Sequence, residues 1–519
     1  MILVFDLGTS YFKFALIDHG GRLVDLYRIQ PPTHCDSSTT STWCPTMELD
    51  AEAFVDILGY GTAQLDARNP GCLATVQAVT FATQTNSFIL LDDACRPLTP
   101  IILWPDARAA GIEEEFRHIC ALPGAAATTG VPALNRQFMA AKLLWMQRNV
   151  PQIWKRTAKI CLMSDYLTLV LTGQHVTEAG TAGLTGLLDI HHLRWWPEIL
   201  ARLNIPCGFL PRVVRAGNDL GPIAGKTANH DQPPTMGTWC PTSGRSMVPA
   251  IAPASRFGLS PRCRFVVGCL DQFAGAIGVG NVAPGCLSET TGTVLATVRC
   301  ADQFHPEAGT PGTPGRGVFQ GPAFARDLYY QMVFGDVSAN YLEWYGKQLP
   351  GRPDFAWLAA QAGRVAPGPG TRAASGLAGG NGLRLRRDVP LSAGENGSRV
   401  GDVFEGLTPA HTPGHVVRCI METVASALGE QVMALTNGCV PAEIRSAGGG
   451  ARSDLWLQIK ADTLAIPVRP TECSEPTCLG AAILAESALS GSCVPAIAGR
   501  WVRLKPPLLP GGDAGVSLQ

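Results

Sequence analysis

The first seventeen residues constrain the fold of this chain more than any other segment. Two short apolar runs, residues 2–5 and 12–17, flank Asp6 and a Gly8-Thr9-Ser10 turn. Runs this short, separated by a glycine turn, predict a β-hairpin. Its tip would present a carboxylate, two hydroxyls and backbone N–H groups, which suit the phosphates of a nucleotide and their divalent cation. The turn leads into a strand, and the G-x-x-x-x-G-K-[ST] motif is absent, which argues against a P-loop NTPase.

Composition sets the scale of the fold. With 519 residues, 46% of them apolar, the chain should form two or more domains with large cores. It contains 57 Gly and 40 Pro, and its charged fraction is 16% against roughly 25% in typical domains. We therefore expect many turns. The net charge of −1 gives no indication of a nucleic-acid or membrane partner.

The hydropathy pattern bears on location. The N-terminal apolar run is cut by Asp6 and has no basic leader, so no signal peptide is expected. The apolar segment 265–282 is interrupted by Asp271 and Gln272, which argues against a membrane span. The 17 cysteines form no C-x-x-C pair and predict reduced thiols rather than a disulfide framework or a zinc site. These features predict a soluble cytoplasmic protein.

Two polar segments follow predicted strands in the first half. The strand over Thr75–Phe81 leads into Gln84-Thr85-Asn86, whose side chains either point into a cleft or cap a neighbour. Trp104, Asp106 and Arg108 combine an aromatic ring, a carboxylate and a guanidinium, which can bind a sugar by stacking and by bidentate hydrogen bonds. The alternative is a salt-bridged loop beneath the tryptophan, which is the simpler interpretation of these residues alone.

Three further segments carry polar or glycine-rich chemistry. A strand from Phe265 delivers Asp271-Gln272 to the start of a small-residue helix, where the carboxylate either caps the helix or reaches across a cleft. The segment 288–294 repeats the hydroxyl-and-glycine pattern of the N-terminal hairpin. Gly448-Gly449-Gly450 runs into a predicted helix over Ser453–Leu464, where bare backbone allows a flat ring or a phosphate to approach closely. Residues 231–255, rich in Pro, Thr, Ser and Gly, predict an exposed loop that looks inserted before the strand from Phe265.

Together these motifs resemble the FGGY carbohydrate kinases, which belong to the actin-like ATPase superfamily with hexokinase and glycerol kinase. The resemblance covers nearly the whole chain in the order of the family, and its blocks are Asp6-Leu7-Gly8-Thr9-Ser10 with Lys13, Trp104-Pro105-Asp106-Ala107-Arg108, Gly268-Cys269-Leu270-Asp271-Gln272, Gly292-Thr293, Gly406-Leu407-Thr408-Pro409 with the helix to Glu422, Gly448-Gly449-Gly450-Ala451-Arg452-Ser453, and Leu479-Gly480-Ala481-Ala482.

The resemblance implies an α/β fold with two ribonuclease-H-like domains and a cleft between them. The first domain, residues 1–281, would bind the sugar and carry the catalytic carboxylate at its end. The second, residues 282–519, would bind ATP. Transfer of the γ-phosphoryl group of ATP to a sugar or polyol hydroxyl follows as the expected reaction.

The resemblance also implies roles for individual residues. Asp271 would be the general base for the substrate hydroxyl, unless it only caps its helix, and Asp6 would hold Mg²⁺ through water. The remaining predicted contacts are with the sugar (Gln84, Thr85, Asn86, Trp104, Asp106, Arg108 and Gln272), with the phosphates of ATP (Gly8, Thr9, Ser10, Lys13, Thr290, Gly292 and Thr293) and with its adenosine (Gly449, Gly450, Ser453 and Asp454). Lys13 has the alternative of being a surface strand residue, and Asp106 with Arg108 that of a structural ion pair.

Substrate identity is constrained less. After Gln84, xylulose kinases usually carry Met-His and glycerol kinases Arg-Glu, whereas this chain has Thr85-Asn86. This uncharged pair predicts a neutral polyhydroxy substrate rather than a sugar acid. A ketopentose such as xylulose is the commonest substrate in the family. The alternatives are another ketose or polyol, or a non-catalytic actin-like sensor that binds ATP. Homodimer formation is left open.

Overall fold

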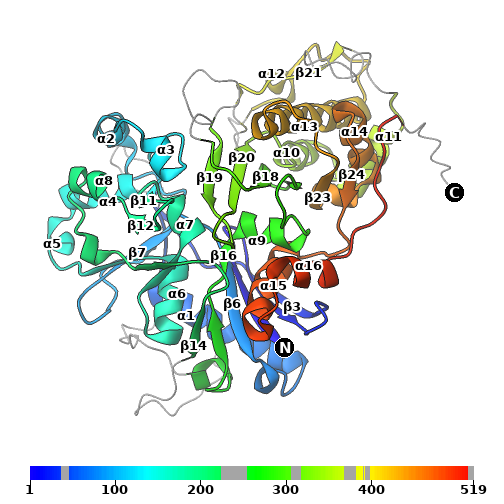
Figure 1. The fold of residues 1–519 in the computed structure, drawn as a ribbon. Helices are drawn as coiled ribbons and strands as arrows, with labels where there is room; N and C mark the ends of the chain where they lie inside the picture. The colour runs from blue at the N-terminus through cyan, green and yellow to red at the C-terminus, as the bar shows by residue number, and fades with distance from the viewer. Residues whose placement is uncertain are drawn as a thin grey trace.

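The computed structural model describes residues 1–36, 46–223, 254–305, 317–366, 382–389, 391 and 398–511 (Figure 1). The predicted loop over 231–255 lies outside these residues up to position 253. Two large sheets, with helices packed around them, form the body of the molecule.

The first large sheet is built from N-terminal strands. These are β1 (Ile2–Leu7), β2 (Phe12–Ile17), β3 (Leu23–Ile29), β6 (Ala78–Thr83), β14 (Asp219–Pro222), β15 (Arg264–Val266) and β16 (Cys269–Leu270). Their order is β14-β15-β6-β1-β2-β3, and β16 also pairs with β6. The predicted hairpin is confirmed as β1 and β2, which pair antiparallel from Ile2 with Ile17 to Leu7 with Phe12. The strand predicted over Thr75–Phe81 begins three residues later, at Ala78.

The second large sheet repeats this connectivity. Its strands are β17 (Leu287–Thr291), β18 (Leu295–Ala301), β19 (Phe319–Pro322), β20 (Tyr329–Gly335), β23 (Ile444–Gly448) and β24 (Val468–Pro470), in the order β19-β20-β18-β17-β23-β24. β17 pairs antiparallel with β18 and parallel with β23, as β1 pairs antiparallel with β2 and parallel with β6. Each half therefore carries a hairpin at the centre of its sheet, as expected for two ribonuclease-H-like domains.

Smaller sheets complete the strand inventory. One has the order β4-β5-β8-β7-β9 and consists of β4 (His34–Asp36), β5 (Thr46–Leu49), β7 (Phe88–Leu91), β8 (Ile101–Ile102) and β9 (Lys159–Leu162). The two-stranded pairs are β10 (Val176–Glu178) with β13 (Arg212–Val214), β11 (Leu188–Asp189) with β12 (Arg194–Trp195), and β21 (Arg384–Leu385) with β22 (Phe404–Glu405).

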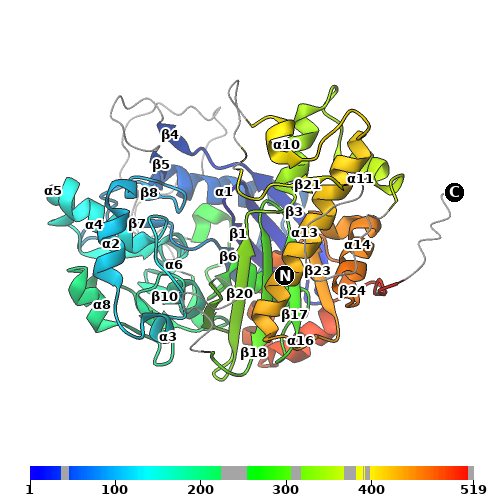
Figure 2. The same ribbon diagram turned by 90° about the horizontal axis from the view of Figure 1, so that it is seen from above.

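Helices surround both sheets. Those of the first half are α1 (Ala51–Arg68), α2 (Glu113–Cys120), α3 (Ala125–Thr129), α4 (Met139–Asn149), α5 (Pro151–Trp154), α6 (Met163–Thr172), α7 (Ala179–Gly183), α8 (Pro197–Arg202) and α9 (Asp271–Gly278). Those of the second half are α10 (Asn340–Gln348), α11 (Phe355–Gly363), α12 (Val400–Val403), α13 (Pro413–Thr436), α14 (Asp454–Leu464), α15 (Pro476–Ser490) and α16 (Val494–Trp501). The long helix α13 lies along β18 and β20 (Figure 2).

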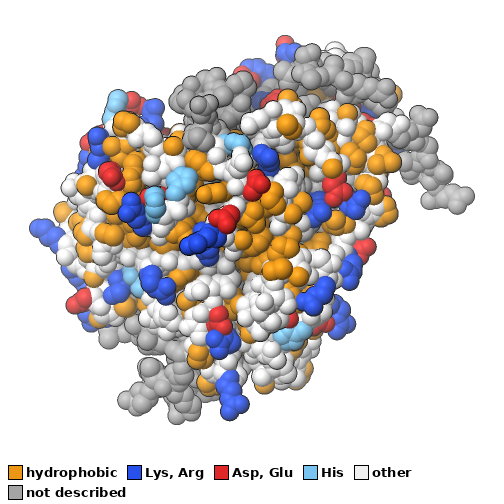
Figure 3. Space-filling model, in the orientation of Figure 1, with side chains coloured by type: hydrophobic (Ala, Val, Ile, Leu, Met, Phe, Trp, Pro, Cys, Tyr) orange, Lys and Arg blue, Asp and Glu red, His pale blue; other side chains and the backbone are white. Residues whose placement is uncertain are grey.

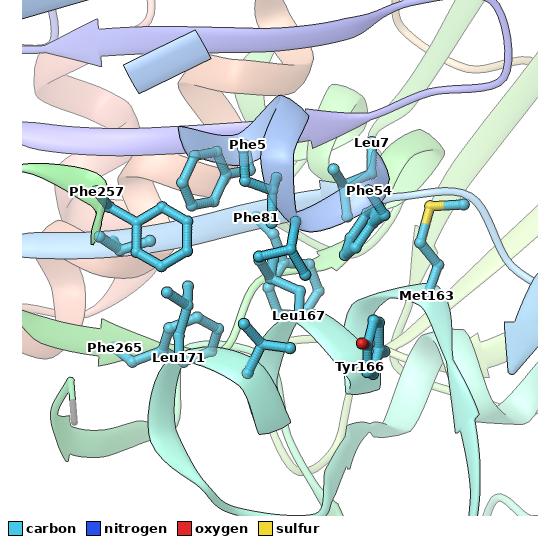
Figure 4. Packing of buried hydrophobic residues seen from close by; sticks show 14 of the residues in the cluster. Phe5, Leu7, Phe54, Phe81, Met163, Tyr166, Leu167, Leu171, Phe257 and Phe265 are labelled. Carbon is cyan, nitrogen blue, oxygen red and sulfur yellow. The ribbon is translucent and has the colours of Figure 1, made fainter. Parts of the chain in front are cut away.

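An aromatic core holds the central strand of the first sheet. Phe5 of β1 and Phe81 of β6 are 0% and 1% exposed, and they pack with Phe54 of α1 and with Tyr166 and Leu167 of α6 (Figure 4). Full burial of an apolar side chain of this size contributes about 1.5–3 kcal/mol to folding. The core thus fixes β1, and with it the position of the polar residues at its end.

Helix α15, from the last part of the described chain, packs against the first sheet. α15 packs on α9 and on strands β1 and β6, and Figure 1 shows it beside β6. The helices α9 and α15 meet backbone to backbone at Gly278 and Gly480. A Cβ on Gly278 would lie 1.8 Å from the Pro476 carbonyl oxygen, and one on Gly480 would lie 1.8 Å from that of Ala274. Only glycine fits at either position.

The surface view agrees with the near-neutral charge of the chain. Figure 3 shows acidic and basic side chains interspersed with apolar ones over this face. In the described part of the chain, no helix has the length and apolar character needed to cross a membrane.

Candidate active site

Two carboxylates emerge at the same edge of the first sheet. β1 and β16 both run parallel to β6, and Asp6 and Cys269 are both paired with Ala82. Asp6 is the next-to-last residue of β1, while Asp271 follows β16 directly and begins α9. The two aspartates therefore lie on either side of the end of β6.

Burial makes ionisation of both aspartates less favourable than in water. Burial raises the pKa of Asp6, although the Lys13 cation opposes this shift. Burial, together with the negative charge of Asp6, raises the pKa of Asp271 to about 7. The Asp271 side chain also accepts a 2.7 Å hydrogen bond from the backbone N–H of Gln272. A carboxylate that titrates near neutral pH is suited to accept a proton.

Lys13 lies among carboxylates. Its Nζ is 3.3 Å from Asp6 Oδ2 and 2.7 Å from Glu475 Oε2. Burial alone would lower the pKa of Lys13, but these two carboxylates raise it above its usual value. Glu475 directly precedes α15, so the lysine joins the N-terminal hairpin to the end of the chain.

The tip of the first hairpin is linked to the predicted sugar side by Thr9. The indole N–H of Trp104 donates to Thr9 Oγ1 over 2.9 Å, and this hydroxyl lies 3.4 Å from Gln84 Oε1. Gln84 Nε2 donates to the Gly8 carbonyl over 3.4 Å. Ser10 is exposed beside them. Residues predicted to contact different substrates thus meet in one hydrogen-bonded group.

Other residues predicted to contact the sugar make internal hydrogen bonds. Thr85 donates to the Thr181 carbonyl over 2.9 Å. Asn86, which has a left-handed backbone with φ 61°, donates to the Leu184 carbonyl and accepts from the Met139 N–H. These contacts join the loop to α4 and to the region of α7, so Thr85 and Asn86 shape the site from its wall.

Asp106 and Arg108 form an internal ion pair. Asp106 is 0% exposed and accepts two side-chain hydrogen bonds from Arg108, of 2.8 and 2.9 Å, and one of 2.7 Å from the Met47 N–H. Arg108 also donates to Glu48. Although burial opposes it, this bonding lowers the pKa of Asp106 below its usual value. The geometry favours the structural alternative for this pair.

The second hairpin, formed by β17 and β18, carries threonines around the glycine at its turn. Thr290 is half-buried, Gly292 lies at the turn and Thr293 is exposed. A pocket of about 470 Å³ adjoins this turn and is lined by Gly292, Thr293 and residues of α10 and α11, among them Asn340, Glu343 and Phe355.

The glycine turn, Gly448-Gly449-Gly450, packs against Thr291 at the end of β17. A Cβ on Gly450 would lie 2.8 Å from the Cβ of Thr291, so the turn approaches Thr291 as closely as a bare backbone allows. Ser453 caps α14 by accepting from the Trp456 N–H, and Gly449 and Asp454 are exposed. Gly449, Gly450, Ser453 and Asp454 do not line the 470 Å³ pocket. Their predicted contact with adenosine stays a prediction.

Comparison with known proteins identifies the family. The model for the N-terminal domain of the FGGY family of carbohydrate kinases matches residues 1–232, and that for its C-terminal domain matches residues 393–489. Together they cover more than half of the chain. The chain belongs to the FGGY family of carbohydrate kinases.

Relatives of this FGGY kinase include a xylulose kinase from Lactococcus lactis subsp. lactis (strain IL1403), 26% identical over 480 residues, which span 89% of this chain and 82% of that protein. A gluconokinase from Bacillus licheniformis is 26% identical over 496 residues, 93% of this chain and 86% of its own. Among solved structures, xylulose kinase from Lactobacillus acidophilus superposes with a TM-score of 0.78 at 21% identity, covering 98% and 94% of the two chains. Glycerol kinase from Plasmodium falciparum with ADP gives 0.75 at 19% identity, covering 98% and 94%. These two solved structures share the fold of this chain.

Sequence reasoning missed two charged residues of this FGGY kinase. Glu475 is separated from its partner Lys13 by more than 460 positions, and nothing in the local sequence links them. Lys142 of α4 is 0% exposed, and its Nζ donates to the carbonyls of Leu103, Trp104 and Gln137 over 2.7–3.0 Å. A lysine inside an apolar helical stripe was the available signal, since a buried charge needs partners.

Proposed function

We propose that this FGGY kinase transfers the γ-phosphoryl group of ATP to a hydroxyl of a neutral sugar or polyol, with a ketopentose such as xylulose as the best candidate. The observation that carries the proposal is that Asp6 and Asp271 lie at the ends of strands on either side of β6, and that Gln84, directly after β6, is hydrogen-bonded to Gly8 and Thr9 just beyond Asp6. A base, a cation-binding carboxylate and a hydroxyl-bearing turn then lie within one site, as phosphoryl transfer requires.

Asp271 serves as the general base in this proposal. Its carboxylate takes the proton of the attacking hydroxyl as the oxygen–phosphorus bond to the sugar forms and the bond between the γ-phosphorus and the bridging oxygen breaks, releasing ADP. Gln272 holds a neighbouring hydroxyl. Thr9 and Ser10 donate to the phosphates from the first hairpin, and Thr290, Gly292 and Thr293 do so from the second. Closure of the cleft excludes water, which would otherwise compete with the sugar.

Asp6 suits Mg²⁺ in this proposal. Asp6 is 5% exposed, and the described residues include no group of three or more His, Cys, Asp or Glu side chains arranged to hold a metal. Mg²⁺ is typically held by one or two carboxylates together with substrate phosphates and water. When bound, the ion neutralises charge on the phosphates. Lys13 would share this task at its position 3.3 Å from Asp6.

A neutral substrate is supported by the state of the cations around the site. Lys13 is paired with Asp6 and Glu475, and Arg108 with Asp106 and Glu48. Lys142 is saturated by three carbonyls. A cation would favour the carboxylate of a sugar acid such as gluconate, but Arg108 and Lys142 are bonded within the protein, and Lys13 is assigned here to the phosphates.

The test is an ADP-release screen of the purified protein with Mg-ATP against ketoses, aldoses, polyols and gluconate. We expect a neutral compound to raise ADP release, and Asp271→Asn to lower kcat by about 10²–10⁴-fold while ATP binding persists. Glu198→Gln, on the exposed side of α8, is the control and should match the wild type. Turnover that survives in Asp271→Asn would refute the base assignment. ATP binding without any turnover would point to the sensor.

A further inference from the structure

A fully buried charge network lies directly beneath the second hairpin. Lys460 of α14 and Glu289 of β17 are both 0% exposed at their side chains, and Lys460 Nζ is 2.6 Å from Glu289 Oε1. Lys460 also donates to Thr291 Oγ1 over 2.7 Å, while Thr291 donates to Glu289 Oε2 over 2.7 Å. Ser446 of β23 donates to Glu289 as well. Every member of this network is thus bonded to at least one other.

The network holds the residue from which the phosphate turn starts. Thr291 is the last residue of β17 and is 0% exposed, and the turn continues through Gly292 and Thr293. Its side chain is held by Lys460 and Glu289 and lies against Gly450, while its backbone carbonyl lies against Gly448. Three elements, β17, β23 and α14, therefore meet at Thr291.

The other end of the turn, at Gly292, is held by hydrogen bonds that do not involve Lys460 or Glu289. The Gly292 carbonyl accepts from Ser338 Oγ over 2.8 Å and from the Ala339 N–H over 3.1 Å, just before α10. At the Thr290 end, β17 pairs with β18 and β23 as far as Thr291, and the network adds side-chain hydrogen bonds at this last paired residue. Burying an ion pair is costly, and a well-packed apolar pair of similar volume is often as stable. A need for stability alone does not account for charge at this position.

We propose that Lys460 is a positioning residue for ATP. Through its contacts with Glu289 and Thr291 it holds the turn formed by residues 290–293 in the position in which that turn contacts the phosphates. The inference rests on the proposed function, in which Thr290, Gly292 and Thr293 contact those phosphates. Lys460 itself touches no substrate. Its effect is on ATP and not on the sugar.

The test separates positioning from stability with a neutral double variant, Lys460→Met/Glu289→Gln. It removes both buried charges but leaves an amide oxygen to accept from Thr291 or Ser446. We expect its Tm to return close to the wild-type value, whereas Lys460→Met alone leaves Glu289 unpaired and lowers Tm strongly. We also expect the Kd of Mg-ATP, measured by calorimetry, to rise at least about tenfold in the double variant, with the KM of the sugar unchanged.

A second variant covers the case in which the double variant does not fold. Thr291→Val keeps the ion pair and the side-chain shape but removes the bridging hydroxyl, and should weaken Mg-ATP binding about fivefold or more. The control is Arg418→Met/Glu422→Gln on α13, a buried pair joined over 2.8 Å, with Arg418 also donating to the Val365 carbonyl. This control should change Tm without changing ATP affinity.

The outcomes are distinguishable. If the wild type binds Mg-ATP and the folded variants at positions 460, 289 and 291 bind it equally well, the positioning role is wrong, whatever their Tm. If the wild type itself binds no Mg-ATP, the proposed function fails first. Weaker ATP binding accompanied by an equal loss of sugar affinity would also overturn the inference, because it would indicate a general loosening of the cleft.

Discussion

The pH dependence of turnover follows from the position of Asp271. A general base must be ionised to accept a proton, and burial together with the charge of Asp6 raises the pKa of Asp271 to about 7. Below that pH the carboxyl is protonated and inactive, and above it the carboxylate is active. The expected profile of kcat/KM for the sugar is therefore an acid limb that rises with pH and levels off above about pH 8.

The pKa of Asp271 sets the size of the change in kcat/KM with pH. With a midpoint near 7, about one tenth of the molecules carry an ionised Asp271 at pH 6 and about nine tenths at pH 8. We expect kcat/KM to rise about tenfold over this interval. The positive charge of Lys13 lowers the pKa of Asp271, so Lys13→Met should move the midpoint to higher pH.

The assay is steady-state turnover at saturating Mg-ATP from pH 5.5 to 9 in overlapping buffers. ADP is quantified after quenching, so that no coupling enzyme limits the rate. Calorimetric binding of Mg-ATP at the same pH values shows whether donor binding contributes to the limb. A profile that is flat from pH 6 to 8, or a midpoint that ignores Lys13→Met, would refute the assignment of Asp271 as a base with a raised pKa.

Three further predictions address the framework of the site. Trp104→Phe deletes the indole N–H that donates to Thr9 and should lower kcat/KM about fivefold at nearly unchanged Tm, as steady-state kinetics and thermal melts can check; an unaltered rate would contradict a role for that bond. Gly480→Ala would place a Cβ 1.8 Å from the Ala274 carbonyl oxygen, so we expect a loss of several kcal/mol and a fall in Tm of about 3–5 °C, whereas Gly499→Ala, with open space around it, should leave Tm nearly unchanged. Burial raises the pKa of Asp165 to about 8, above its value in the unfolded chain. Between about pH 4 and pH 8 the folded state therefore keeps a proton that the unfolded chain loses. The free energy of unfolding falls as the pH rises through this range. Asp165→Asn should remove up to about 1.4 kcal/mol per pH unit of that slope in urea titrations at pH 6 and pH 8, and an identical slope in wild type and variant would show that Asp165 does not titrate there.

Local pattern was enough to predict the features that depend on neighbouring residues. The alternation of apolar runs around Gly8 predicted the hairpin of β1 and β2, and the predicted helix over Ser453–Leu464 begins at Asp454 with Ser453 as its cap. Asp271 stands at the start of a small-residue helix, as expected. In each case the determining contacts lie within a few residues.

The contacts between segments that lie far apart in the sequence could not be predicted. The pairing of Lys13 with Glu475 and the saturation of Lys142 by three carbonyls depend on tertiary packing, which no local pattern encodes. For the same reason Asp106 and Arg108 could be interpreted as sugar ligands or as an ion pair. Only their burial and mutual hydrogen bonds favour the second interpretation.

The contact between α9 and α15 has a consequence for the order in which the molecule can be assembled. Asp271 begins α9, and α9 rests on a helix that starts at Pro476, near the end of the chain. During synthesis, α9 therefore cannot rest on α15 until residues 476–490 have left the ribosome, long after Asp271 itself. A nascent or truncated chain that lacks residues after 475 is expected to form the first sheet without the helix on which α9 rests, and therefore without a fixed position for Asp271.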